Sequence, residues 1–121
     1  MGLSNAGENK LLTLFKDSGT LYVGLFTVAP GEDGGGTEVS GAGYARQKVS
    51  FGTPAGGSMS NSAALEFPTA SANWGTAQAW ALFDAASGGT MLWYGAVTEP
   101  KELFAGDIYR VDAGNLVLTM D

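Results

Sequence analysis

After Gly19 this chain is a succession of short segments rich in β-branched and aromatic residues, separated by turns that are rich in glycine. Residues 20–28, TLYVGLFTV, form an almost unbroken apolar run, which predicts a strand in the middle of a sheet. Glycine-containing connections, AASGG and DAG, indicate tight turns between later segments. We therefore expect an all-β fold, a β-sandwich or jelly roll of about seven to eight strands. The other predicted strands are residues 44–51, 58–67, 76–84, 90–97, 107–111 and 115–120.

Alternation of apolar and polar residues predicts which side of two strands is buried. In residues 44–51, Arg46 and Lys48 lie on the side opposite the apolar residues, where charge pairing is expected. That pairing is either local or between subunits. The residues expected to face the core are Ala45, Val49 and Phe51 in the first strand and Met59, Ala63, Leu65 and Phe67 in the second.

One amphipathic helix is predicted before the strands, within SNAGENKLLTLFKDSG. Asn5 followed by Glu8 fits a capping box, and Gly19 would end the helix. Leu11, Leu14 and Phe15 are expected to share its apolar face. This short N-terminal helix either covers an open end of the sheets or docks on a partner through Leu11 and Phe15.

With 121 residues the chain has room for a single domain, residues 1–121, with a helical arm over 1–19 and the sandwich over 20–121. Residues 1–10 lack the basic stretch and apolar run of a secretory signal. No apolar run is long enough to cross a membrane, so we expect no membrane partner. The net charge is −6 and the six basic residues are scattered, which argues against nucleic acid as a partner.

The sequence holds no cysteine and no histidine, so thiolate catalysis, disulfides and histidine-assisted hydrolysis are excluded. A pair of carboxylates flanking a cleft, as in a glycosidase, is the catalytic alternative that remains. Because the acidic residues lie mostly in predicted turns, we expect solvated surface charge and no enzyme activity. We also expect no catalytic residue, no cofactor and no metal site.

Residues 29–43 form a long connection, rich in glycine and acidic residues, between two predicted strands. A structureless loop of this length is usually functional or a linker. Its carboxylates, Glu32, Asp33 and Glu38, suit a calcium ion chemically, although their spacing matches no EF-hand. We interpret the loop as a docking arm whose removal leaves the sandwich folded. The candidate partner-binding residues on and beside it are Glu32, Asp33, Glu38, Tyr44 and Arg46.

The three tryptophans are expected to differ in role. Trp80 and Trp93 lie inside predicted strands, where a place in the core or in a subunit interface is expected. Trp74 lies in a predicted loop and is the aromatic residue we keep as a candidate contact, for example with a sugar ring.

The order of several segments resembles that of small virion proteins of tailed bacteriophages. Sequences of this group are labelled tail fibre proteins, and similar small β-sandwich proteins serve as capsid cement, or decoration, proteins. The resemblance covers nearly the whole chain and implies binding without chemistry. The most specific segments that carry it are GGGTEVSGAGYAR, WGTA, LFDAASGG and LWYGA.

This resemblance implies a protein made in the cytoplasm of the host bacterium and placed in the virion. Because a chain of charge −6 is repelled by packaged DNA, we expect it on the outer surface of the capsid. There it would act as a cement protein that binds the major capsid protein, as a homodimer or homotrimer at the symmetry axes of the shell. The alternative is a structural module of a tail fibre or baseplate that contacts a host glycan through Trp74.

Overall fold

The computed structural model describes residues 2–120, which form one helix and nine strands. The two end residues of the expected domain, Met1 and Asp121, lie outside the described residues. The elements are α1 (Asn5–Lys16), β1 (Leu21–Val28), β2 (Thr37–Glu38), β3 (Gln47–Val49), β4 (Ser58–Ser60), β5 (Leu65–Glu66), β6 (Gly75–Phe83), β7 (Met91–Leu103), β8 (Arg110–Val111) and β9 (Val117–Thr119).

The main sheet is antiparallel, with the strand order β2-β1-β6-β7, and β3 also pairs with β1. The prediction that residues 20–28 form a central strand is confirmed, because β1 has partners on both edges. The predicted hairpin across AASGG is confirmed as well, as β6–β7. Strand β7 extends further than expected, to Leu103, and forms an edge of the sheet.

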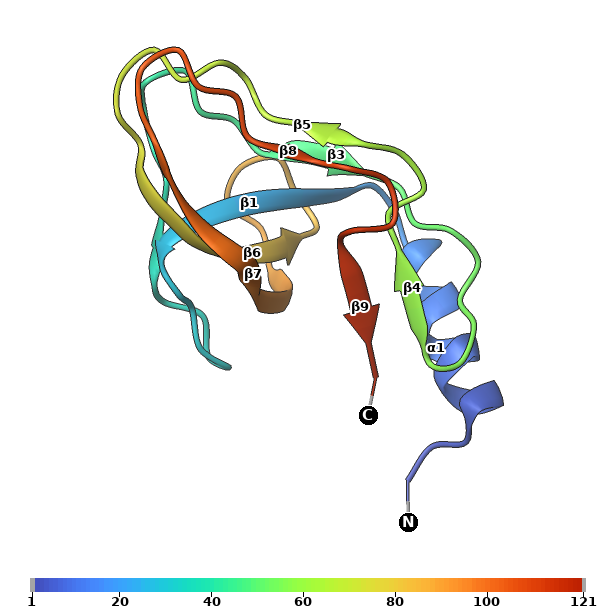
Figure 1. Cartoon of the computed structure of the whole chain (residues 1–121). Coiled ribbons are helices and arrows are strands. Elements are labelled where there is room, and N and C mark those ends of the chain that lie inside the picture. Colours follow the sequence, from blue (N-terminus) through green and yellow to red (C-terminus); the bar gives the residue numbers. More distant parts are fainter. Residues whose placement is uncertain (1, 121) are drawn as a thin grey trace.

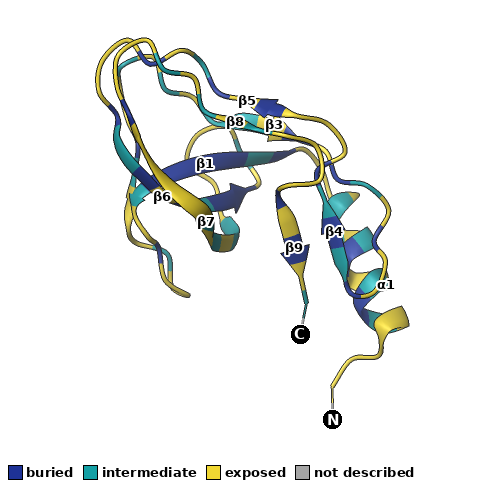
Figure 2. Cartoon of the chain, in the orientation of Figure 1, coloured by how far each residue is buried: buried dark blue, intermediate teal, exposed yellow. Residues whose placement is uncertain are grey.

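Two small antiparallel pairs, β4–β9 and β5–β8, form the opposing layer. In Figure 1 β5 and β8 run beside β3 and above β1, while β4 lies next to α1 and β9 lies on the other side of β4. Side chains from both layers form one core between them, seen as buried segments of the strands in Figure 2. The all-β sandwich with a short N-terminal helix is therefore the observed fold. The most deeply buried side chains of this core include Leu12, Val23, Leu25, Phe67, Leu82, Leu103 and Leu118.

A smaller apolar cluster lies apart from the main core and contains Phe26, Ala79, Ala81 and Phe83. The rings of Phe26 and Phe83 stack with their centroids 6.2 Å apart. A bulge in the β6–β7 pairing falls between Ala77 and Ala79. Across this irregularity the side chains of β6 change face, so that Ala77 belongs to the main core and Ala79 to the second cluster.

The turn at DAG forms as predicted, with the Asn115 N–H donating to the carbonyl of Asp112 at 3.1 Å. The strands on its two sides do not pair with each other, since β8 pairs with β5 and β9 pairs with β4. The buried side chain of Asn61 explains this corner. Its Oδ1 accepts from the N–H groups of Gly114 and Leu116 at 3.1 and 2.9 Å, and its Nδ2 donates to the Asp112 carbonyl at 3.1 Å.

The burial predicted from alternation is correct at Val49, Phe51, Met59, Leu65 and Phe67, which are all buried. It is wrong at Ala45 and Ala63, which are exposed. Regular strand structure covers only residues 47–49 and 58–60 with 65–66, so the alternation does not extend to the two alanines.

Helix α1 begins one residue earlier than predicted, because Ser4 and not Asn5 is its cap. The Ser4 Oγ accepts a hydrogen bond from the Gly7 N–H at 3.1 Å. The helix ends at Lys16 with Asp17 as the C-cap, so Gly19 does not end it. Among residues 2–120, no helix has the length and apolarity that a membrane crossing requires.

The buried face of α1 also differs from the prediction. Leu12 is fully buried, whereas Leu11 and Leu14 are 43% and 62% exposed. The helix lies against β4 through the side that carries Glu8, Leu12 and the half-buried Phe15, residues that follow one another at helical spacing. The outward leucines therefore form an apolar strip on the surface.

Candidate functional site

Residues 29–43 are not a structureless loop, contrary to the prediction. Gly31 and Gly34 exchange two backbone hydrogen bonds of 2.9 and 3.0 Å, which close a turn around Glu32 and Asp33. The chain then returns along β1 as β2, and Val39 enters the core. The segment is a β-hairpin with an exposed tip and a packed base.

The three carboxylates of this segment do not come together. Glu32 and Asp33 are exposed at the tip, whereas Glu38 lies at the base and pairs with Arg46. Within residues 2–120 no group of three acidic side chains is placed to hold a metal ion. Glu32 and Asp33 are therefore accessible to a partner, as the docking-arm hypothesis requires. Glu38 is instead paired with Arg46 within the chain.

Glu38, Tyr44 and Arg46 form one hydrogen-bonded network. Arg46 donates to both carboxylate oxygens of Glu38, from Nε to Oε2 and from Nη2 to Oε1, each at 2.8 Å. The Tyr44 hydroxyl donates to Glu38 Oε2 at 2.6 Å. This two-point pairing holds both partners more firmly than a single contact would. The expected charge pairing of Arg46 is therefore local, within the chain.

Arg46 also ties the hairpin base to the β6–β7 turn. Its Nη1 donates to the carbonyls of Ala85 and Gly88 at 2.9 and 2.8 Å, and its guanidinium lies 3.5 Å from the centre of the Phe83 ring. Hydrogen bonding to Glu38 raises the pKa of the Arg46 guanidinium, which stays charged. The guanidinium thus joins two loops that are about forty residues apart in the chain.

The hydroxyl of Tyr44 fills a gap in the hydrogen bonding of β1. It accepts a hydrogen bond from the Leu25 N–H at 2.9 Å, between the parts of β1 that pair with β3 and β2. Burial and the Glu38 carboxylate raise the pKa of the Tyr44 phenol well above its ordinary value. A neutral Tyr44 is therefore a structural part of the sheet, and its hydroxyl is not free for a partner.

Trp74 is not a surface contact residue, contrary to the prediction. It is 7% exposed, packs edge-on against Tyr44 with ring centroids 5.4 Å apart, and donates from Nε1 to the Ala42 carbonyl at 3.0 Å. The indole N–H is thus satisfied inside the protein. Trp74 supports the base of the hairpin.

Of the two helix candidates, Leu11 is exposed and Phe15 is half-buried. Phe15 contacts Trp93 of β7 edge-on, with ring centroids 5.8 Å apart. Leu11 therefore remains available on the outer strip of α1, whereas Phe15 links the helix to the main sheet.

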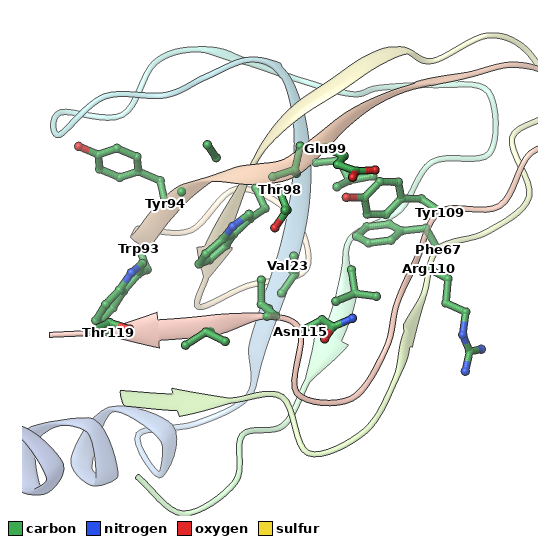
Figure 3. Close-up of a pocket in the computed structure, with 18 residues that line it drawn as sticks. Val23, Phe67, Trp93, Tyr94, Thr98, Glu99, Tyr109, Arg110, Asn115 and Thr119 are labelled. Carbon is green, nitrogen blue, oxygen red and sulfur yellow. The ribbon is translucent and has the colours of Figure 1, made fainter. Parts of the chain in front are cut away.

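Sequence reasoning missed a groove between β7 and the C-terminal segment that carries β8 and β9. Its volume is about 700 Å³. Figure 3 shows β7 and β9 on opposite sides of it, with Val23 of β1 between them, Tyr109 and Phe67 at one end and Trp93 pointing toward β9. The lining residues are Val23, Leu25, Phe67, Trp80, Trp93, Tyr94, Gly95, Ala96, Val97, Thr98, Glu99, Tyr109, Arg110, Val111, Asn115, Leu116, Val117 and Thr119.

Two residues of the sequence, Trp80 and Gly95, point to this groove once the strand pairing is known. Trp80 lies opposite Gly95 in the β6–β7 register, and a Cβ at Gly95 would stand 3.0 Å from the Trp80 ring. A glycine facing a tryptophan in a strand indicates a close approach of a large ring to the backbone. The pairing of the strands was needed to recognise it.

Comparison with known families finds a match that spans nearly the whole chain. Residues 2–119 match the sequence model of a family described as Podophage GP4 fiber I protein gp80. No curated protein matches the sequence.

Proposed function

Because the chain belongs to the family of the podophage GP4 fiber I protein gp80, a family of phage virion structural proteins, we propose that it acts without enzymatic chemistry, by binding other virion proteins. The family match over residues 2–119 is the observation that carries this proposal. The fold agrees with it, since a small all-β unit with exposed strand edges and an exposed hairpin tip offers surfaces for assembly.

For the place in the particle, we propose the outer surface of the capsid, as a decoration or cement protein. The net charge of −6 supports this, because packaged DNA repels an acidic surface. Glu32, Asp33, Glu99 and Glu102 are all exposed and form no ion pair among residues 2–120, so much of the negative charge faces solvent. The proposed partner is the major capsid protein, bound by a homodimer or homotrimer.

The second candidate is a structural part of a fibre or baseplate, and the description of the matched family favours it. A fibre component would use the same sandwich and the same exposed tip. The contact with a host glycan through Trp74 is dropped from this candidate, because Trp74 is buried.

Copy number per virion separates the two candidates. A protein that covers the capsid is present at a number comparable to that of the major capsid protein, whereas a fibre component is present in few copies. Quantitative mass spectrometry of purified virions gives this ratio, and electron cryomicroscopy of the same particles gives the position. A near-stoichiometric ratio supports the cement role, and a ratio of a few copies per particle supports the fibre role. Complete absence from purified virions contradicts both.

A further inference from the structure

We propose that the groove between β7 and β8–β9 binds an extended segment of another virion protein, with apolar side chains and at least one basic residue, as an added β-strand. This inference rests on the proposed function, because it names how the protein would join its partner.

The two long sides of the groove are strand edges with no partner among residues 2–120. β7 pairs only with β6, β9 pairs only with β4, and β8 pairs only with β5. The backbone hydrogen bonds of residues 109–120 that reach other segments go to the side of β4 and β5. A free strand edge presents a row of N–H and C=O groups, and another peptide strand satisfies such a row best.

β7 is protected along only part of this edge. Between Ala96 and Lys101, opposite Gln78 of β6, β7 bulges and carries the extra residues 97–100. This bulge, Pro100 and the charge of Lys101 all discourage the addition of another strand. The preceding stretch, residues 91–96, has neither charge nor proline. The groove is lined by part of this unprotected stretch, residues 93–96, and by the first part of the bulged stretch, residues 97–99. Strand addition is therefore expected along residues 91–96, with Thr98 and Glu99 at the end of the added strand.

The interior of the groove suits apolar side chains. Its floor includes Val23 and Leu25 of β1, and the rings of Trp80 and Trp93 line it only half-buried. At one end the half-buried ring of Tyr109 packs edge-on against Phe67, with the ring centroids 6.0 Å apart. A volume of about 700 Å³ lies within the range of about 300–1,000 Å³ typical of binding pockets. Alternate side chains of an added strand would enter this space.

The charged residues at the edge of the groove, Glu99 and Arg110, indicate which kind of segment can bind there. Glu99 forms no ion pair among residues 2–120, and Arg110 is already held by Glu66 at 3.1 Å and Asp112 at 3.0 Å. The rim is therefore acidic, and it attracts a basic residue next to the inserted segment. A second copy of this chain carries a net charge of −6, so it fits this acidic rim less well than a basic segment does, and the proposed dimer or trimer would form through another surface.

The first test places a photo-crosslinking amino acid at Thr98, which lines the groove, and in a matched strain at Val28, an exposed position outside it. Virions assembled with each full-length variant are purified and irradiated, and crosslinked peptides are identified by mass spectrometry. We expect position 98, and not position 28, to capture one segment of one other virion protein, apolar and with a basic residue. Capture of a second copy of this chain, or of no protein at position 98, overturns the proposal.

The second test uses charge reversal on one strand. Glu99 lines the groove and Glu102 does not, although both are exposed residues of β7. Glu99→Lys is expected to lower incorporation into virions about tenfold, whereas Glu102→Lys, with the same change in net charge, leaves it unchanged. Equal incorporation of both variants contradicts the proposed charge preference. The melting temperature of each purified variant checks that the fold is intact.

A third test compares two valine-to-lysine variants, one on the β9 side of the groove and one outside the groove. Val117 of β9 lines the groove and is 48% exposed, and Val28 lies outside it at 57% exposed. Val117→Lys is expected to reduce incorporation, since an inward lysine opposes strand addition, and Val28→Lys is not. The outcome that overturns the peptide proposal is binding of a purified host surface glycan by the unchanged protein together with loss of that binding in Val117→Lys, which would favour a glycan.

Crosslinking and incorporation together distinguish failure of the groove interaction from failure of the proposed structural role. If the protein is present in virions and crosslinks to neighbours only from positions outside the groove, the groove proposal fails and the structural role stands. If the protein is absent from virions, the proposed function itself fails.

Discussion

The guanidinium of Arg46 and the carboxylate of Glu38 meet through two hydrogen bonds of 2.8 Å each, at the base of the hairpin between β1 and β3. Little of either side chain is exposed, with 9% for Arg46 and 22% for Glu38. The pair fastens the hairpin to the body of the sandwich.

Arg46→Ala is expected to lower the free energy of unfolding by about 3 kcal/mol, because it leaves the largely buried Glu38 carboxylate without its cation. Chemical denaturation followed by circular dichroism measures the change. The control is Arg110→Ala, whose exposed pairs with Glu66 and Asp112 are expected to contribute little. Equal losses for the two variants would contradict the structural role of the Glu38–Arg46 pair.

Gly24→Ala is expected to destabilise the protein by about 1–3 kcal/mol. A Cβ at this position would stand 2.9 Å from the Tyr44 hydroxyl and collide with the Glu38 carboxylate, both of which are held by hydrogen bonds. Gly52→Ala is the matched control, since its Cβ would meet only the Ser60 carbonyl, at 3.8 Å. Thermal unfolding of the two variants checks the prediction, and a melting temperature of Gly24→Ala at or above that of Gly52→Ala would refute it.

The hairpin tip and its base are expected to respond differently to change. Glu32→Ser with Asp33→Ser alters only exposed side chains, so the free energy of unfolding should change by less than about 0.5 kcal/mol. Deletion of residues 31–41 removes Glu38 and the buried Val39 as well, and it should destabilise the fold, contrary to the expectation from the sequence.

The tip variant then tests the docking arm. If the tip binds a partner, the folded double variant enters virions less well than the unchanged protein. Incorporation at the normal level would show that residues 29–43 do not act as a docking arm, since their base is already occupied in holding the sandwich together.

Trp74→Ala is expected to cost about 3–5 kcal/mol, because a large buried ring and its hydrogen bond to the Ala42 carbonyl are lost. Trp93→Ala should cost less, since Trp93 is only half-buried beside the groove. Denaturation measurements give the order of the two losses. The reverse order would place Trp93 in the core and Trp74 at the surface.

Stability is expected to fall in alkaline solution. Burial raises the pKa of the Tyr109 phenol above its ordinary value of 10.0, so above that pH the unfolded chain loses a proton that the folded chain keeps. The free energy of unfolding therefore decreases as pH rises from 10 toward the folded pKa. Tyr109→Phe should make this decrease shallower and leave stability at pH 7 nearly unchanged. An identical slope for both proteins in denaturation series from pH 8 to 11 would contradict the prediction.

Some of the fold could be predicted because local patterns decide it. The apolar run of residues 20–28 requires burial on both faces, and this placed β1 in the middle of the sheet. The glycine-rich AASGG loop is short enough to force its flanking strands together, as β6 and β7 are. The partners of β8 and β9 could not be predicted, because they depend on the hydrogen bonds of Asn61, which lies about fifty residues earlier.

For the candidate site, too, part of the outcome follows from the sequence and part from the tertiary structure. The sequence by itself determined the residue types that are present: an acidic chain without histidine or cysteine, a glycine-rich connection that carries Glu32, Asp33 and Glu38, and an arginine expected to pair with a carboxylate. Only the tertiary structure decided that Glu38, Tyr44 and Trp74 are internal supports, and that β7 and β9 leave a groove between them. Exposure and strand pairing depend on contacts between distant segments, and the free energy of those contacts is set by the packing of the whole sandwich.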